Sequence, residues 1–122
     1  MTQTVLIVEN EPFVLNAMEE ILATVGFVLI CAYDGAQGFA AYKERSSEID
    51  LVILDMNLPG MAGPEVFQAM QGVDPHVKVI VSSGYDEFEV VKRFGNHQSM
   101  QILKKPFNAQ MLIDKVQTVL SS

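Results

Sequence analysis

Four short polar segments carry the residue types that are needed to handle a phosphoryl group: Glu9-Asn10, Asp55, Ser83-Gly84 and Lys105. The Asp55 carboxylate can attack phosphorus to form an acyl phosphate, provided that the negative charge on the phosphoryl oxygens is neutralised. Glu9 and Asn10, together with Asp55, offer the oxygen ligands that Mg²⁺ prefers, and a metal ion neutralises one phosphoryl oxygen. The Lys105 ammonium can neutralise a second oxygen, and the hydroxyl and amide of the third segment can bind the remaining one. The residue types therefore predict phosphoryl transfer onto Asp55 if the fold brings the four segments together.

Each of the four segments follows a short apolar run with the length of a β-strand. Residues 51–54, immediately before Asp55, are four consecutive apolar residues between an acid and a Pro-Gly turn, which is typical of a central strand buried on both faces. Similar apolar runs cover residues 4–8, 27–32, 77–81 and 100–103. In an open parallel sheet the carboxyl ends of the strands line one crevice, where ligands bind. We therefore expect the four polar segments to converge there.

The residues between these runs show the apolar spacing of α-helices. The first helix is predicted by apolar residues that recur on one face before Gly26, namely Val14, Leu15, Met18, Ile21, Leu22 and Val25. We expect Asn10 to cap this helix and Pro12 to lie in its first turn. Further helices are predicted over residues 36–45, 63–72 and 85–94, and after an Asn108 cap. Five strands that alternate with five helices predict a single-domain, flavodoxin-like, doubly wound α/β sandwich over residues 1–122, with a parallel sheet in the order 2-1-3-4-5.

The composition sets limits on the partners. Lys and Arg number 8 against 15 Asp and Glu, a net charge of -7, and a surface of that sign repels nucleic acid. No apolar stretch approaches the roughly 18 residues of a membrane span and no leader precedes the first strand, so a cytoplasmic protein without membrane contact is expected. The single Cys31 lies in an apolar run, which favours a buried hydrophobic role, and no Cys/His spacing suggests zinc. His76 and His97 have no partners at catalytic or metal-ligand spacing, which favours surface positions for both.

The polar segments and their flanking strands resemble the receiver domains of two-component response regulators. The resemblance rests on the motifs at residues 5–9, 54–61, 81–84 and 105–107, which occur in the order and at the spacing of that family. It implies a signalling switch rather than an enzyme, in which Asp55 is phosphorylated by a histidine kinase or phosphotransfer protein. It also implies that the backbone carbonyl of Asn57 binds Mg²⁺ and that Ser83 and Lys105 contact the phosphoryl group. In this family the residue equivalent to Pro106 often follows a cis peptide bond.

The chain departs from the receiver pattern at two positions. Receiver domains usually carry two acids after the first strand, whereas the second position here is Asn10, so one negative charge is missing from the metal pocket. One unit charge about 4 Å from another contributes roughly 4 kcal/mol at an effective dielectric constant of about 20, so Mg²⁺ is expected to bind more weakly. Glu11 is close enough in sequence to supply a carboxylate instead. At Ile102 the family often has Tyr or Phe for its conformational switch, and Tyr85 is a candidate substitute, with plain packing as the alternative.

These departures leave three functions to be distinguished. The first is a switch that is phosphorylated at Asp55 and then changes the face that binds a downstream protein or output domain. The second is a protein-interaction module of receiver fold that works without phosphorylation. The third, an aspartate-dependent phosphohydrolase, is disfavoured because such enzymes need a second acid two residues after the first, where this chain has Asn57. The resemblance also leaves open a homodimer through the fourth helix, fifth strand and fifth helix, whereas the cognate kinase and the output target are specified by no pattern in the sequence.

Overall fold

The computed structural model describes residues 2–122 and contains a five-stranded parallel sheet in the order β2-β1-β3-β4-β5. The strands are β1 (Thr4–Val8), β2 (Val28–Ala32), β3 (Leu51–Asp55), β4 (Val79–Ser83) and β5 (Met100–Lys104). Each strand is followed by a helix, and the helices are α1 (Pro12–Thr24), α2 (Gly35–Arg45), α3 (Gly63–Val73), α4 (Glu87–Phe94) and α5 (Ala109–Ser121). The expected flavodoxin-like α/β fold is therefore confirmed.

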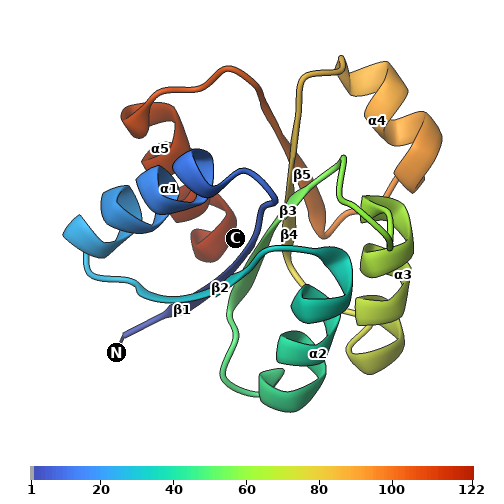
Figure 1. Cartoon of the computed structure of the whole chain (residues 1–122), viewed down its shortest axis with the longest axis horizontal. Helices are drawn as coiled ribbons and strands as arrows, with labels where there is room; N and C mark the ends of the chain where they lie inside the picture. The colour runs from blue at the N-terminus through green and yellow to red at the C-terminus, as the bar shows by residue number, and fades with distance from the viewer. Residues whose placement is uncertain (1) are drawn as a thin grey trace.

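The helices form two layers on the sheet, as Figure 1 shows. α1 and α5 cover one face of the sheet, and α2, α3 and α4 lie on the other. We call these the α1/α5 face and the α2/α3/α4 face. Within residues 2–122, no helix combines the length and the hydrophobicity that are needed to cross a membrane.

Strand alternation divides the apolar side chains between the two faces. In β3, Leu51 and Ile53 pack on the α1/α5 face, whereas Val52 and Leu54 pack on the α2/α3/α4 face. All four side chains are buried, and the burial of each stabilises the fold by roughly 1.5–3 kcal/mol. The near-continuous apolar run is explained because a central parallel strand is covered on both sides. The same alternation decides on which face the polar residues at the carboxyl ends of the strands lie.

The largest difference in strand boundaries concerns β4. Its apolar pattern predicts residues 77–81, but the strand spans Val79–Ser83. Ser82 and Ser83 belong to it because their backbone carbonyls accept hydrogen bonds from Met56 N (3.1 Å) and Lys105 N (2.7 Å). Polar side chains hide this backbone pairing from a hydrophobicity pattern. As consecutive strand residues, the two serines point to opposite faces of the sheet.

Asn residues are expected to cap the starts of helices α1 and α5. Asn108 caps α5 as expected, because its side chain accepts a hydrogen bond from Met111 N at 2.8 Å. The expected Asn10 cap of α1 is wrong. Pro12 is the first residue of that helix, so the capping position falls on Glu11, whose side chain makes no cap hydrogen bond. Asn10 therefore lies one residue before the capping position.

Candidate functional site

Three charged side chains meet at the carboxyl edge of the sheet. Glu9 follows β1, Asp55 ends β3 and Lys105 follows β5. The Lys105 ammonium lies 3.4 Å from Glu9 Oε1 and 3.4 Å from Asp55 Oδ1. These contacts join residues that are 96 and 50 positions apart in the chain. The fold thus brings the polar segments after β1, β3 and β5 together, as their positions in the sequence predict.

The two carboxylates are buried, whereas the cation between them is partly exposed. Glu9 is 1% exposed and Asp55 6%, while the Lys105 side chain retains 30% of its exposure. Burial raises the pKa of the Glu9 carboxyl above its usual range, and the nearby Asp55 carboxylate raises it further, against the opposing effects of the Glu11 amide and the Lys105 ammonium. One ammonium therefore faces two carboxylates, and the site holds an excess of negative charge that a further cation would relieve.

Backbone amides fix both carboxylates. Glu11 N donates to Glu9 Oε2 at 3.0 Å, and Asn57 N donates to Asp55 Oδ1 at 3.2 Å. Each donor lies two residues after its carboxylate, in the loop that follows the strand, and for Asp55 this is the local geometry of an Asx turn. Glu11, the candidate for an additional metal ligand, touches the site through this amide. The expected cis peptide bond is present between Lys105 and Pro106.

The oxygen atoms at this edge suit a hard cation such as Mg²⁺. Glu9 and Asp55 contribute two carboxylates, and the adjoining loops contribute the neutral oxygens of Asn10 and Asn57, both of which are exposed residues. Within residues 2–122, no group of three or more His, Cys, Asp or Glu side chains is arranged to hold a metal ion. Two charged and two neutral oxygen donors at one edge are of the chemical type that Mg²⁺ prefers, with two carboxylates among them.

The Ser83 hydroxyl does not join the three charged side chains. It donates to Met56 Sδ at 3.3 Å and accepts a hydrogen bond from Tyr85 N at 2.9 Å. Met56 belongs to the core of the α2/α3/α4 face. The expected convergence fails for this residue because Ser83 lies inside β4, where strand alternation turns it away from the face of Asp55. A phosphoryl group on Asp55 would meet this hydroxyl only after a local rearrangement.

The comparison with known families agrees with this geometry. Residues 5–117 match the family model of the response regulator receiver domain. The chain belongs to the response regulator receiver domain family. Similar proteins include the sporulation initiation phosphotransferase F of Bacillus subtilis, which is 29% identical over 98% of this chain and 95% of its own length. The chemotaxis protein CheY of Treponema pallidum is also 29% identical, over 95% of this chain and 81% of that protein.

Receiver domains similar to this one also occur inside longer proteins. A cyclic di-GMP phosphodiesterase of Thermotoga maritima is 34% identical over 113 residues, which are 93% of this chain but 30% of that protein. Among solved structures, a response regulator receiver protein from Sinorhizobium medicae has a TM-score of 0.88 at 26% identity, over 99% of this chain and 96% of the other. The relatives thus share the receiver domain but differ in how much further sequence they carry, since the matched region is 30% of one relative and 95% of another.

Ile102 occupies the position at which receiver domains often have Tyr or Phe. Ile102 is half-buried and packs against the core of the α2/α3/α4 face. Tyr85, the candidate substitute, is 40% exposed, and the Arg93 guanidinium lies 4.8 Å from its ring centroid. In this conformation Tyr85 therefore makes a surface cation–π contact rather than a buried packing contact.

Ser82 is the site residue that the sequence did not single out. It is 1% exposed, and within residues 2–122 its hydroxyl is the one buried side-chain polar atom without a hydrogen-bond partner. The sheet register places it directly beside Asp55 on the neighbouring strand. The available signal was a pair of serines after an apolar run, but the strand boundary decides which of the two hydroxyls lies on the side of Asp55.

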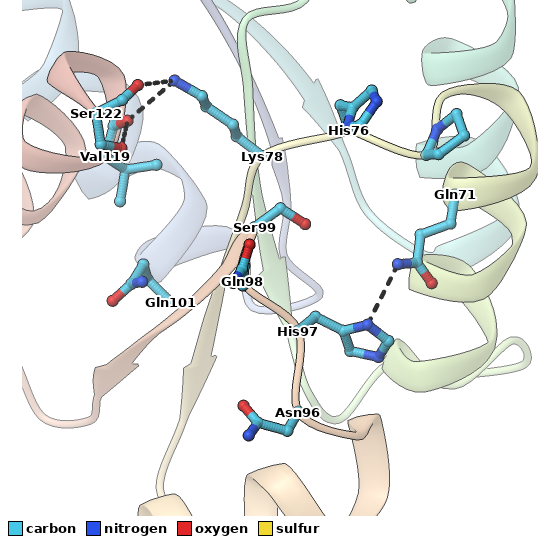
Figure 2. Close-up of a pocket in the computed structure, with 11 residues that line it drawn as sticks. Gln71, His76, Lys78, Asn96, His97, Gln98, Ser99, Gln101, Val119 and Ser122 are labelled. Carbon is cyan, nitrogen blue, oxygen red and sulfur yellow. Dashed lines mark hydrogen bonds between the residues drawn. The ribbon is translucent and has the colours of Figure 1, made fainter.

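A cavity of about 490 Å³ lies at the opposite edge of the sheet, where β4 and β5 begin (Figure 2). Lys78 reaches across this edge, and its ammonium donates to the backbone carbonyls of Val119 (3.3 Å) and Ser122 (2.8 Å). These bonds tie the start of β4 to the end of α5. His76 and His97 both line the cavity.

The expected surface positions hold for one histidine and not for the other. His76 is exposed, whereas His97 is half-buried. The His97 ring lies 2.8 Å through Nε2 from the Phe94 carbonyl, 3.4 Å through Nδ1 from the Gln71 amide nitrogen, and 4.9 Å edge-on from the Phe67 ring. The prediction for His97 is wrong because the loop after α4 folds this ring onto α3 (Figure 2), a contact between distant segments that no local pattern shows.

Proposed function

We propose that this receiver domain is a phosphorylation-controlled switch of a two-component system, with Asp55 as the residue that takes the phosphoryl group. The observation that carries the proposal is the Lys105 ammonium, 3.4 Å from both Glu9 Oε1 and Asp55 Oδ1. A cation beside a buried carboxylate at the open edge of the sheet is suited to neutralising a phosphoryl group that arrives there. The proposal treats residues 1–122 as one domain that acts in the cytoplasm.

In the proposed reaction, a carboxylate oxygen of Asp55 attacks the phosphorus of a phosphohistidine on the donor protein. The N–P bond of the donor breaks as the O–P bond of an acyl phosphate forms, and the leaving imidazole takes up a proton. The Lys105 ammonium then binds a phosphoryl oxygen, and Ser83 with the Gly84 amide binds another once β4 has rearranged. In this proposal the domain acts as a signalling switch rather than as an enzyme.

Mg²⁺, when bound, would neutralise charge on the phosphoryl oxygens. The proposed ligands are the side chains of Glu9, Asn10 and Asp55 and the backbone carbonyl of Asn57. Because Asn10 is neutral, we expect weaker magnesium binding than two acids at this position would give. The buried, incompletely neutralised Glu9 carboxylate supports a cation site here.

Phosphorylation would act on partners by drawing Ser83 toward the phosphoryl group. Ser83 would then leave Met56 Sδ and Tyr85 N, its present hydrogen-bond partners. Because Tyr85 lies just before α4, the loss of its contact with Ser83 would alter the start of α4 and the surface that α4 forms with β5 and α5. We propose that this surface binds the downstream protein or output domain, or a second copy of the chain.

An apolar groove beside the site suits the phosphodonor protein. The groove has a volume of about 400 Å³ and is lined by α1 and by the segment that follows β5, with Lys105 at its end. The Phe13 side chain of α1 lines this groove and is 88% exposed. An exposed apolar ring does not contribute to the stability of the fold. Exposed apolar side chains around a reaction site favour a protein partner. A histidine kinase or phosphotransfer protein docked there would bring its phosphohistidine to Asp55.

Incubation with Mg²⁺ and acetyl phosphate, followed by intact-mass measurement, tests the proposal. We expect the native chain to gain the mass of one phosphoryl group and Asp55→Asn to gain none, because an amide does not form the acyl phosphate. Asp114→Asn, a change of the same kind at an exposed position of α5, is the matched control and should be modified like the native chain. An unmodified native chain, or an adduct that persists in Asp55→Asn, would overturn the proposal.

A second candidate function is a receiver-fold interaction module that works without phosphorylation. The exposed, neutral Asn10 and the Ser83 hydroxyl on the opposite face favour it. This function requires that Asp55→Ala leaves the affinity for a binding partner unchanged. A partner that binds native and Asp55→Ala chains equally, combined with an unmodified native chain in the phosphodonor experiment, would establish it over the switch.

A further inference from the structure

The buried hydroxyl of Ser82 lies on the strand beside Asp55 and has no hydrogen-bond partner among residues 2–122. Ser82 is 1% exposed, and its Oγ is the one buried side-chain N or O atom without a partner in the part of the chain that the structure describes. Such a group destabilises a folded protein unless a partner is supplied, and native proteins keep few of them. The position of Ser82 indicates where its partner would come from.

Ser82 shares a face of the sheet with Asp55. The two residues are register partners on β4 and β3, and neighbouring strands lie about 4.8 Å apart. Two residues earlier, Ile53 and Ile80 both pack on the α1/α5 face, so strand alternation directs Asp55 and Ser82 to that side as well. Ser83 points to the other side, where its hydroxyl is already hydrogen-bonded. Of the two adjacent hydroxyls, the one on the side of Asp55 is therefore the one with a vacant hydrogen bond.

Lys105 cannot hold Asp55 and an incoming phosphoryl group equally. Its ammonium is shared between Glu9 and Asp55 at 3.4 Å from each, longer than the roughly 2.7–2.9 Å of a close charge-assisted hydrogen bond. The side chain is also 30% exposed, so it can turn toward the crevice. Once the ammonium moves to a phosphoryl oxygen, the Asp55 oxygen that it contacted retains the Asn57 amide as its one donor among residues 2–122.

We propose that the Ser82 hydroxyl replaces the Lys105 ammonium as a hydrogen-bond donor to the Asp55 carboxyl group once a phosphoryl group, or a tetrahedral mimic of one, is attached there. Rotation about the Cα–Cβ bond of Ser82 redirects the hydroxyl between staggered positions without moving the backbone. The new hydrogen bond stabilises the phosphorylated state, because the unphosphorylated state lacks it. Ser82 is thus a positioning residue, and this role rests on the proposed function of Asp55.

Beryllofluoride with Mg²⁺ is a suitable probe, because it attaches to an aspartate as a tetrahedral mimic of the phosphoryl group and is not turned over. The apparent Kd of beryllofluoride is measured by NMR titration for the native chain, Ser82→Ala and Ser82→Thr. We expect Ser82→Ala to raise the apparent Kd about fivefold, the effect of one hydrogen bond. Ser82→Thr keeps the hydroxyl and should remain within about twofold of the native value. Urea unfolding without beryllofluoride is the folding control, in which Ser82→Ala should be at least as stable as the native chain.

Each outcome bears on the proposal. Equal apparent Kd values for the native chain and Ser82→Ala would overturn the role of Ser82 and leave the function of Asp55 standing. A native chain that does not bind beryllofluoride would overturn both. Weaker binding in Ser82→Ala that Ser82→Thr does not restore would assign the effect to packing and reject the hydrogen bond. Marked destabilisation of unliganded Ser82→Ala would also contradict the proposal, because the hydroxyl would then contribute before the phosphoryl group arrives.

Discussion

The two edges of the sheet use their polar side chains in opposite ways. At the amino edge, Lys78 donates to two backbone carbonyls and the His97 ring contacts Gln71 (Figure 2), while its other nitrogen lies beside the Phe94 carbonyl. At the carboxyl edge, two buried carboxylates share the Lys105 ammonium, and the Ser82 hydroxyl has no hydrogen-bond partner in the part of the chain that the structure describes. Both edges are hollowed, so a cavity by itself does not distinguish them. The edges differ in whether their buried polar groups have enough partners. Those at the carboxyl edge do not, and a ligand would be expected to bind there.

The largest expected effect comes from removing the shared cation. Lys105→Met leaves Glu9 and Asp55 buried without an ammonium. We expect the free energy of unfolding in urea, without Mg²⁺, to fall by about 2.5 kcal/mol, less than for a fully buried pair because the Lys105 side chain is 30% exposed. Adding Mg²⁺ should recover part of the loss, because a cation again faces the two carboxylates.

Lys104→Met is the matched control for this change. Lys104 is the neighbouring residue, but its exposed ammonium contacts the Gly84 carbonyl at 3.1 Å rather than a carboxylate. We expect its substitution to change the free energy of unfolding by less than about 0.5 kcal/mol, with no dependence on Mg²⁺. If both variants lost the same free energy of unfolding, the two buried carboxylates would not depend on the Lys105 ammonium for neutralisation.

The next effect concerns the amino edge. His97→Ala removes the hydrogen bond to the Phe94 carbonyl and the edge-on contact with the Phe67 ring. We expect a loss of about 1.5 kcal/mol in the free energy of unfolding. His76→Ala, at an exposed position of the same cavity, should stay within about 0.5 kcal/mol of the native chain. Neither variant should change the stabilisation by Mg²⁺, and a change in His97→Ala would show that the two edges are coupled.

The fold was predictable because its signals are local. Each strand of the sheet contains a short apolar run, and each helix shows apolar spacing on one face, so element order and type follow from windows of a few residues. The positions of Glu9, Asp55 and Lys105 followed as well, because each comes directly at or after the carboxyl end of a strand. A doubly wound sheet then brings these ends together whatever the details of packing.

The sequence did not predict to which face of the sheet Ser82 and Ser83 point. A strand boundary shifted by two residues placed Ser82 and Ser83 inside β4. Side chains in a strand alternate with a period of two, so the backbone pairing decides on which face each hydroxyl lies. Polar residues give no hydrophobicity signal from which this pairing could be predicted. The contact of His97 with α3 could not be predicted from the sequence either, because it depends on how a loop folds back onto a distant helix.

The smallest expected effect has the opposite sign and tests the contrast most directly. Glu9→Gln removes a carboxylate whose burial raises its pKa. A carboxyl with a raised pKa in the folded state binds its proton more tightly there than in the unfolded chain, so stability falls as pH rises from the ordinary value of 4.5 through the folded value. We therefore expect Glu9→Gln to exceed the native chain in stability near neutral pH without Mg²⁺, by on the order of 1 kcal/mol.

Magnesium should then reverse this order. If the Glu9 carboxylate binds Mg²⁺, the ion stabilises the native chain more than Glu9→Gln, because only the native chain offers the charged ligand. Glu20→Gln, the same change at an exposed position of α1, is the matched control, and Mg²⁺ should stabilise it as much as the native chain. The measurement is urea unfolding at about pH 5 and about pH 8, with and without Mg²⁺. A Glu9→Gln variant that is less stable than the native chain without Mg²⁺ would mean that the carboxylate is already well compensated. The carboxyl edge would then be built for stability, as the amino edge is.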